Sequence, residues 1–186
     1  WKILAADLSG TFFEQLRSLI VGKAYTSADL AFYNKGNQLP SLITTNISTS
    51  IMSVLFPAIA NISDEKARVK EMTRKAVKIM SFVMFPMLFG LAAASGPLIN
   101  VLFTSKWALA VPFVQILSIS SAISLIGGVS LQAIKAIGKS DIILKLEVYK
   151  KPVYVLLLII GVKINVTAVA VTMLLYSIYG NVVNAG

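Results

Sequence analysis

Long runs of apolar residues alternate with short polar stretches along the whole chain. Six apolar segments can be drawn, most of them close to the roughly 20 mostly apolar residues that a helix needs to cross a bilayer. They cover residues 3–22, 39–62, 76–103, 108–137, 146–162 and 166–183. Runs of this length favour membrane-spanning helices over the core of a water-facing globule, so we expect an all-α membrane protein with a six-transmembrane-helix lobe.

The polar stretches between these segments contain residues that begin and end helices. In KAYTSADLAFYNKGNQ, Ser27 is a candidate N-cap and Gly36 a candidate helix breaker. Further along, Ser63 can cap the helix that follows it, and Gly138 is a natural helix stop. The charged stretch GKSDIILKLEVYKK, which starts at Gly138, interrupts the apolar pattern before the fifth segment.

Composition supports the membrane class and excludes several kinds of chemistry. Hydrophobic residues make up 56% and charged residues 13% of the 186 positions, and the mean hydropathy is +0.79. Soluble domains carry about 25% charged residues. The chain has neither cysteine nor histidine, which excludes disulfides, thiolate or imidazole metal sites and any nucleophile–histidine dyad. We therefore expect no catalytic residue, no metal and no cofactor, and a protein that is not an enzyme.

The net charge of +9 is distributed in a way that predicts the orientation of the helices. Because the basic residues lie between apolar segments, they suit lipid headgroups and membrane topology better than nucleic acid. Six basic residues lie in 63–78 and five in 135–151, whereas the opposite connections hold only Lys23, Lys35, Lys106 and Lys163. The positive-inside rule then predicts a multi-pass protein of the plasma (inner) membrane with both basic connections and both chain ends in the cytoplasm.

The first apolar segment carries a polar stripe. On a helix of 3.6 residues per turn, its polar residues fall within a sector of about 120°. They are Asp7, Thr11, Glu14, Arg17 and Ser18. Charges at membrane depth are costly and normally face a bundle interior or a water-filled cavity. The stripe therefore predicts that this helix borders a hydrophilic space.

The second segment repeats this pattern with uncharged groups. Asn46, Thr49, Ser50, Ser53 and Pro57 share one face of the expected helix. Such groups either form hydrogen bonds between neighbouring helices as packing contacts or line a cavity. Because two adjacent helices with polar stripes can enclose a cavity, the three ionisable groups of the first segment favour the second interpretation.

Three stretches of the chain resemble a known family of membrane proteins. LRSLIVGKAYTSADLAFYNKGNQLP, SVLFPAIANI and especially LQAIKAIGKSDIILKLEVYKK are similar to stretches of bacterial polysaccharide exporters. These are the lipopolysaccharide and teichuronic-acid type flippases of the multidrug/oligosaccharidyl-lipid/polysaccharide exporter superfamily. The resemblance covers nearly the whole chain and is strongest up to about residue 151. At Glu14 and Arg17, where family members often place Asn or Tyr, this sequence departs from the family pattern.

The resemblance implies an architecture and a cargo. It implies two six-helix lobes around a central cavity, of which residues 1–186 match the C-terminal lobe. The chain, which opens on Trp1 without an initiator Met, is then expected to be a piece of a longer protein whose N-terminal lobe is its partner. The implied cargo is an oligosaccharide linked to undecaprenyl pyrophosphate, flipped to the outer leaflet for cell-surface polysaccharide biosynthesis. Membrane lipids are further expected partners, and glycan-synthesis enzymes are candidates.

Within this architecture the polar stripes become the predicted substrate cavity. Its expected lining residues are Arg17, Glu14, Asp7, Asn46, Ser50 and Ser53. Glu14 and Arg17, one helical turn apart, have two interpretations. Either the two charges only neutralise each other, or Arg17 binds the pyrophosphate of the carrier and Glu14 holds Arg17 when the cavity is empty.

Two other functions stay open at this point. A cation-coupled multidrug exporter of the same superfamily would have an acidic cavity, whereas an anionic lipid carrier favours a basic one. A non-transporting membrane scaffold that recruits glycan-synthesis enzymes is the alternative from a different class. The polar stripes argue against the scaffold, because a scaffold has no need of charge at membrane depth.

Overall fold

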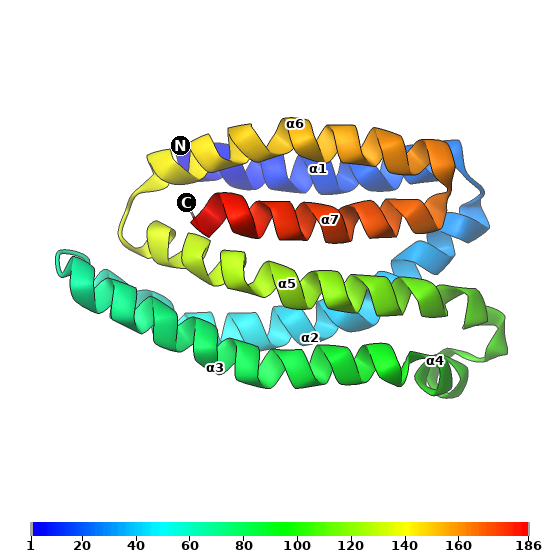
Figure 1. Ribbon diagram of the computed structural model, residues 1–186, viewed down its shortest axis with the longest axis horizontal. Helices are drawn as coiled ribbons and strands as arrows, with labels where there is room; N and C mark the ends of the chain where they lie inside the picture. The colour runs from blue at the N-terminus through cyan, green and yellow to red at the C-terminus, as the bar shows by residue number, and fades with distance from the viewer. Residues whose placement is uncertain (1, 186) are drawn as a thin grey trace.

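The computed structural model describes residues 2–185, and within that range every side chain except those of residues 2, 3, 5–7, 14 and 185. Every regular element in this part of the chain is a helix, which confirms the all-α class. The elements are α1 (Lys2–Ala24), α2 (Ser27–Ala60), α3 (Lys66–Ala93), α4 (Ser95–Phe103), the 3-10 helix η1 (Ser105–Ala110), α5 (Val111–Ala136), α6 (Ser140–Ile164) and α7 (Val166–Ala185). The long helices run up and down along one axis (Figure 1).

The length and apolarity of the helices confirm the membrane class. Among the described residues, four stretches are long and apolar enough to cross a bilayer. They are Ser27–Ala60, Lys66–Ala93, Ser105–Ala136 and Val166–Asn184. The helices α1 and α6 are of comparable length, but their charged residues are spaced so that neither contains an apolar stretch long enough to be among these four. Their crossing of the bilayer stays a prediction.

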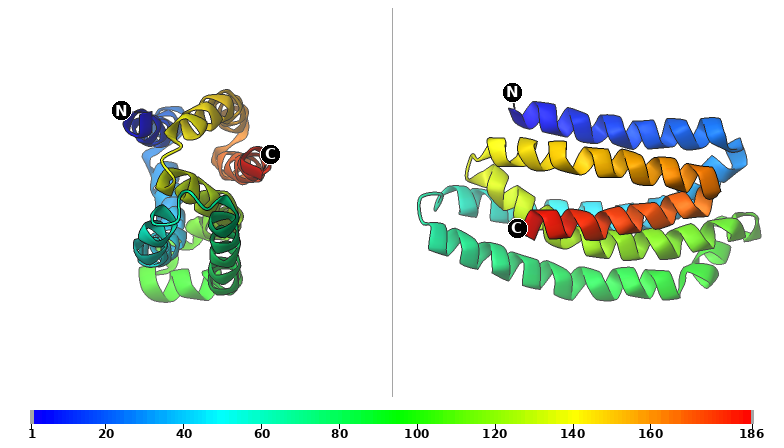
Figure 2. Two further views of the ribbon diagram at one scale, coloured as in Figure 1. Left: turned by 90° about the vertical axis from the view of Figure 1, so that its left-hand side faces the viewer. Right: turned by 45° about the horizontal axis from the view of Figure 1, so that its top comes forward.

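The order of the helices gathers the two basic connections at one end of the bundle. The start of α1, the end of α7 and the α2–α3 and α5–α6 connections all lie at that end (Figure 1, Figure 2). The α1–α2 and α6–α7 connections and α4 lie at the opposite end (Figure 1). The arrangement therefore places both basic connections on the side of the chain ends, and the assignment of that side to the cytoplasm stays a prediction.

The second helix begins at Ser27 and not near residue 39 as the sequence pattern predicted. Its N-cap is Thr26, one residue before the predicted cap. The Thr26 Oγ1 accepts a hydrogen bond from Asp29 N at 3.1 Å, and Asp29 Oδ2 accepts one from Thr26 N at 3.2 Å. This capping box starts the helix within the polar stretch that was expected to be a turn-rich connection.

Gly36 brings α2 close to α5, and the prediction that it breaks a helix is wrong. A Cβ at position 36 would overlap Phe113 Cβ and would lie 3.1 Å from both Ala110 O and Val114 N. One turn earlier, the ring of Tyr33 meets the ring of Phe113 edge-on, with centroids 5.7 Å apart. The missing side chain therefore lets α2 pack against the start of α5, which fixes the direction of the polar face of α2.

The third predicted segment is two helices. The N-cap position of α3 is Glu65, which makes no side-chain capping bond, so the predicted cap at Ser63 is wrong. The chain turns at Ala94 and continues as α4. Gly96 and Pro97, which fall inside the third predicted segment, lie in the first turn of α4. Proline is tolerated there because the first turn leaves its N–H groups unbonded, so this pair begins a new helix.

The charged stretch after α5 is helical, so α6 begins at Ser140 and not near residue 146. Gly138, with a φ of 74°, follows the end of α5 and acts as the predicted helix stop. The Glu147 carboxylate pairs with Lys150 Nζ at 2.7 Å and with Lys151 Nζ at 3.1 Å. Because opposite charges three and four residues apart can pair on a helix surface, they interrupt the apolar pattern without interrupting the helix.

An asparagine joins α7 to α5. Asn181 Oδ1 accepts a hydrogen bond from Gly127 N at 2.6 Å, and Asn181 Nδ2 donates to the carbonyl oxygen of Ile123. Polar side chains that bond across neighbouring helices stabilise membrane bundles. Gly127 leaves room for this contact, because a Cβ there would lie 2.5 Å from Asn181 Oδ1 and 2.6 Å from Asn184 Nδ2.

The neighbouring glycines Gly127 and Gly128 give a matched test of this contact. We expect Gly127→Ala to be less stable than Gly128→Ala by about 2 kcal/mol, because Asn181 must turn away and lose two hydrogen bonds. A Cβ at position 128 meets nothing within 4 Å, and both variants share the advantage of alanine over glycine in a helix. Thermal unfolding of the two proteins in the same detergent measures the difference. Equal stability would show that the Asn181 contact does not hold α7 to α5.

Candidate functional site

A cavity of about 820 Å³ lies inside the bundle. Side chains from α1, α2, α3, α5, α6 and α7 line it. Seen along the bundle, α1 and α7 lie on opposite sides of the molecule (Figure 2). The volume falls in the range of roughly 300–1,000 Å³ that is typical of ligand sites.

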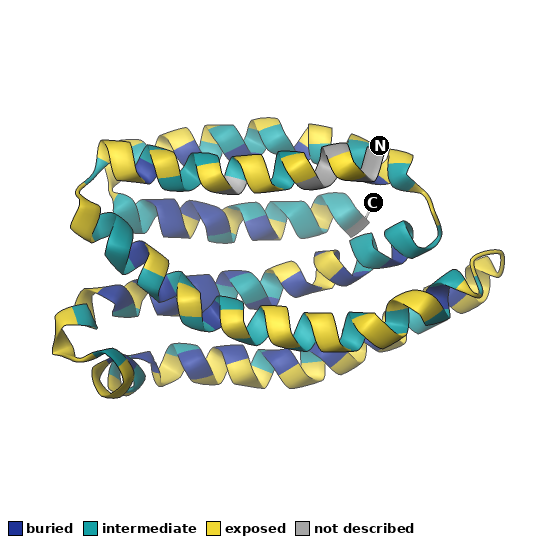
Figure 3. Ribbon diagram, turned by 180° about the vertical axis from the view of Figure 1, so that it is seen from behind, coloured by how far each residue is buried: buried dark blue, intermediate teal, exposed yellow. Residues whose placement is uncertain are grey.

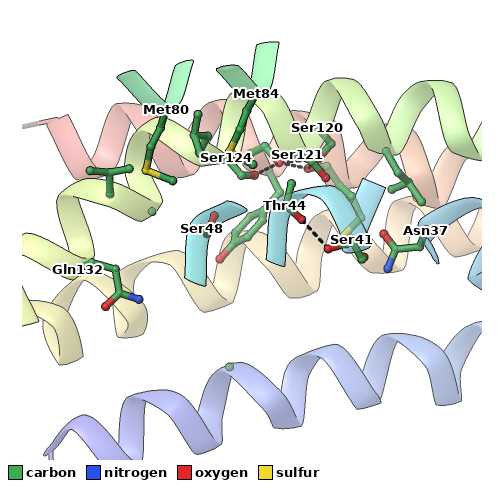
Figure 4. A pocket seen from close by; sticks show the side chains of 18 of the residues that line it. Asn37, Ser41, Thr44, Ser48, Met80, Met84, Ser120, Ser121, Ser124 and Gln132 are labelled. Atoms are coloured by element: carbon green, nitrogen blue, oxygen red, sulfur yellow. Dashed lines mark hydrogen bonds between the residues drawn. The ribbon is translucent and has the colours of Figure 1, made fainter. Parts of the chain in front are cut away.

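Hydroxyl and amide groups line much of the cavity. On α2, Asn37, Ser41, Thr44 and Ser48 recur every three or four residues, which places these four on one helix face. The set comprises Asn37, Ser41, Thr44, Ser48, Thr49 and Ser53 on α2, Ser120, Ser121, Ser124 and Gln132 on α5, and Ser177 on α7. Figure 4 shows the hydroxyls of α2 beside the serines of α5. We call these residues the hydroxyl wall.

Hydrogen bonds between helices hold part of the hydroxyl wall in place. Ser177 Oγ lies 2.7 Å from Ser120 Oγ and accepts a hydrogen bond from Ser124 Oγ at 2.8 Å. Ser177 Oγ itself donates to Met173 O at 2.9 Å. Each hydroxyl has one donor and two acceptor lone pairs, so this network orients the groups and leaves acceptor capacity for a ligand.

Arg17 is the cation that α1 contributes to the cavity. Its Nη1 donates to Met173 Sδ at 3.4 Å, and its guanidinium carbon lies 5.7 Å from the centroid of the Tyr33 ring. Its Nε is buried and has no hydrogen-bond partner among the described residues. A thioether sulfur is a weak acceptor. Among the described residues, Arg17 therefore contacts no strong hydrogen-bond acceptor, and its guanidinium group can still donate to an anion.

Lys151 is the cation that α6 contributes. Its Nζ lies 3.1 Å from Glu147 Oε2 and 4.7 Å from the centroid of the Phe13 ring. Among the lining side chains that the structure describes, Arg17 and Lys151 are the cations and no carboxylate is present. The charged side chains of the described lining are therefore cationic.

Some of the residues predicted to line the cavity do line it in the structure, and others do not. Ser53 lines the cavity, as Arg17 does. Asn46 and Ser50 are exposed and do not line it. The Nδ2 of Asn46 and the Oγ of Ser50 donate to carbonyl oxygens of their own helix, at 2.7 Å and 2.8 Å. The side chains of Asp7 and Glu14 lie outside the described residues.

Most of the hydroxyl wall was missed at the sequence level. The face of α2 that lines the cavity starts at Asn37, which the sequence pattern had assigned to a connection before the helix. The serines of α5 were recognisable as hydroxyls one turn apart in an otherwise apolar helix, in the run SISSAIS. Lys151 was counted with a basic connection, because the charged start of α6 was not recognised as helical.

Comparison with known proteins identifies a family. The sequence profile of the family described as polysaccharide biosynthesis protein matches residues 1–112, more than half of the chain. The chain is 26% identical to the teichuronic acid biosynthesis protein TuaB of Bacillus subtilis (strain 168) over 75% of its own length. It is 22% identical to the succinoglycan biosynthesis transport protein ExoT of Rhizobium meliloti (strain 1021) over 76%. It is 24% identical to the lipopolysaccharide biosynthesis protein WzxC of Escherichia coli (strain K12) over 78%.

These relatives are much longer than the matched region. The aligned residues make up 29% of TuaB, 28% of ExoT and 30% of WzxC. The chain therefore spans less than a third of the length of the relatives it matches. No solved structure matches the chain significantly.

Proposed function

We propose that this chain, which belongs to the polysaccharide biosynthesis protein family, is one lobe of an exporter that flips a polyprenyl-pyrophosphate-linked oligosaccharide from the cytoplasmic to the outer leaflet. The family membership confirms the resemblance recognised in the sequence. The observation that carries the proposal is the chemistry of the cavity, in which the hydroxyl wall lies beside Arg17 and Lys151. Such a cavity suits a molecule that is part sugar and part phosphate.

The two kinds of lining group match the two polar parts of this cargo. Serine, threonine, asparagine and glutamine side chains both donate and accept, so they pair with sugar hydroxyls in many orientations. The guanidinium of Arg17 suits bidentate contact with phosphate oxygens. Because the described lining holds cations and no carboxylate, a multidrug exporter for cationic drugs is less well supported. A scaffold has no use for a polar cavity inside a membrane bundle.

The exposed face of α2 supports a second lobe. Of its 34 residues, only Tyr33, Gly36, Pro40 and Ile59 are buried. Figure 3 shows α2 from behind, largely exposed or intermediate. That face includes the polar residue Asn46, and polar groups are costly against lipid but suit a protein partner or a water-filled space. A second lobe on this face would rock against α1 and α2 and expose the cavity to each side of the membrane in turn.

The orientation of the lobe can be tested by labelling, because the chain has no cysteine of its own. We expect cysteine in place of Lys106 or Lys163 to react with a membrane-impermeant maleimide added to intact cells. Cysteine in place of Lys70 or Lys139 is expected to react only after permeabilisation. All four side chains are exposed, so differences in reactivity report the side of the membrane. The reverse labelling pattern would contradict the assignment of the basic connections to the cytoplasm.

Complementation of a strain that lacks its polysaccharide exporter tests the proposed function. We expect the full-length protein to restore cell-surface polysaccharide, and residues 1–186 alone to insert into the membrane without restoring it. One lobe cannot enclose a two-lobed cavity, which is the reason for the second expectation. Export by residues 1–186 alone would contradict the two-lobed architecture, and the absence of export by a well-expressed full-length protein would contradict the function.

A further inference from the structure

A second hollow of about 720 Å³ lies between α1 and α6. Its lining is mostly apolar and comes mainly from α6, with Ser9 and Phe13 from α1. Apolar side chains of α6 are exposed along it, including Leu156 (58% exposed) and Ile159 (51% exposed). In Figure 1, α1 and α6 run side by side. We call this hollow the α1–α6 groove.

The groove and the cavity of about 820 Å³ that contains the hydroxyl wall meet at two residues. Phe13 and Lys151 line both. The ring of Phe13 lies under the Lys151 ammonium, with Nζ 4.7 Å from the ring centroid. On the cavity side, Tyr154 Oη donates to Phe13 O at 3.1 Å, and the two rings meet edge-on. Side chains of Phe13 and Lys151 therefore form a seam between an apolar groove and a polar cavity.

The seam carries positive charge that the described side chains around it do not fully balance. Glu147 is shared by Lys150 at 2.7 Å and Lys151 at 3.1 Å. Lys150 is only 5% exposed, and among the described side chains Glu147 is the one carboxylate that both ammonium groups contact. An uncompensated charge in such surroundings is costly, and an anionic ligand at Lys151 would offset that cost.

The depth of Lys151 in the membrane limits which anions can reach its ammonium group. From Ser140 to Lys151 the helix rises about 16 Å, at 1.5 Å per residue. If α6 crosses the bilayer, Lys151 lies near the middle of a hydrocarbon core that is about 30 Å thick. The phosphate of an ordinary phospholipid stays at the membrane surface. A phosphate at Lys151 therefore belongs to a lipid whose headgroup enters the bundle.

The groove extends along α6 on both sides of Lys151. Leu144 and Val148 lie before Lys151, and Val155 and Ile159 lie after it. A hydrocarbon chain can therefore lie in either half of the groove while its phosphate remains at the seam. This is the geometry that a lipid needs when its headgroup passes through the protein and its chain changes leaflets.

We propose that the α1–α6 groove holds the hydrocarbon chain of a long, single-chain lipid phosphate. The phosphate binds Lys151 at the seam that Phe13 and Lys151 form. This inference rests on the proposed function, since it assigns a binding site for the chain of the carrier. Glu147 is the counter-ion of Lys151 while the seam is empty, and the phosphate takes its place. The headgroup beyond the phosphate then lies in the central cavity beside the hydroxyl wall.

Fluorescence quenching in nanodiscs tests the site without requiring export. The full-length protein carries a single labelled cysteine, introduced as Ile159→Cys in the groove or as Phe82→Cys on α3, where position 82 is 82% exposed. The probes are stearyl phosphate, stearyl alcohol, phosphatidylcholine and phosphatidylglycerol, each with a nitroxide on its chain. At position 159 we expect stearyl phosphate to quench at about tenfold lower mole fraction than the others, the effect of one charge-assisted hydrogen bond. At position 82 we expect no difference between probes.

Substitutions at Lys151 in the seam and at Val155 in the groove test whether the lipid phosphate binds there. Lys151→Gln is expected to abolish the tenfold preference, and Lys151→Arg to retain it. Val155→Trp, which fills the groove without touching the charge, is expected to abolish it as well. Unchanged quenching by phosphatidylcholine in a variant shows that the fold is intact.

Three results would overturn the proposal: equal quenching by phosphate and phosphatidylcholine at position 159, a preference that survives both Lys151→Gln and Val155→Trp, or equally strong quenching by phosphatidylglycerol. The last would assign the groove to ordinary anionic lipid. Selective quenching in a protein that does not export would keep the site and contradict the proposed function. Export without selective quenching would contradict the site alone.

Discussion

Replacement of Arg17 with glutamine is expected to reduce polysaccharide export by roughly 10- to 100-fold, which corresponds to about 1.5–3 kcal/mol for hydrogen bonds to a charged group. The reason is its place in the cavity, where its described contacts are a thioether and a ring and its buried Nε has no described partner. Lys163→Gln removes a cation from an exposed position and serves as the control. Export by complemented cells, normalised to the amount of protein in the membrane, measures the effect.

The double variant Arg17→Gln with Glu14→Gln separates the two interpretations of this pair. If the charges only neutralise each other, the double variant leaves no unpaired charge at membrane depth and export should recover. If Arg17 binds the phosphate of the cargo, the double variant should insert normally and export as poorly as Arg17→Gln alone. Full export by the double variant would end the hypothesis that Arg17 is a substrate contact.

Substitution of Gly36 is expected to have the largest effect on the fold. A leucine there should destabilise the protein by about 3 kcal/mol, the upper part of the range for overpacked sites. Its Cβ would meet Phe113 Cβ and the backbone of α5 rather than the flexible tip of a side chain, so α2 and α5 must separate. The control is Gly90→Leu in α3, where a Cβ meets nothing within 4 Å.

Thermal unfolding and gel filtration in one detergent compare the two glycine variants. We expect Gly90→Leu to elute and unfold as the unmodified protein does, and Gly36→Leu to unfold at a clearly lower temperature or to aggregate. Equal unfolding temperatures would mean that the close approach of α2 and α5 is not needed for stability. Other contacts would then have to hold the α2 part of the hydroxyl wall in place.

The long apolar runs predicted the helices of the fold well, because burial in a membrane leaves a strong signal in the sequence. The positions of α5 and α7 are close to those predicted. The apolar segments predicted for α2, α3 and α6 begin later than the helices do, since each of these helices begins with polar or charged residues. In all three the signal for helix lay in local pairs that hydropathy does not measure, such as the Thr26–Asp29 capping box and the Glu147–Lys150 pair.

The site was harder to predict than the fold, because a cavity depends on which face of each helix turns inward. Arg17 and Ser53 line the cavity, whereas Asn46 and Ser50 lie on the same helix as Ser53 but outside it. The direction of α2 is set by its contact with α5 at Gly36, which the sequence pattern had interpreted as a helix break. The hydroxyls of α5 became part of the site only through the packing of α5 against α2, α3 and α7.

The most direct test of the central claim follows the cargo itself across a membrane. The full-length protein is reconstituted in liposomes that hold a polyprenyl-pyrophosphate-linked oligosaccharide in both leaflets, and membrane-impermeant periodate oxidises the sugars that face outward. The account predicts that the sugars of the inner leaflet also become oxidised in the presence of the protein, and that this fraction falls sharply with Arg17→Gln. Oxidation limited to the outer leaflet, as in protein-free liposomes, would contradict it.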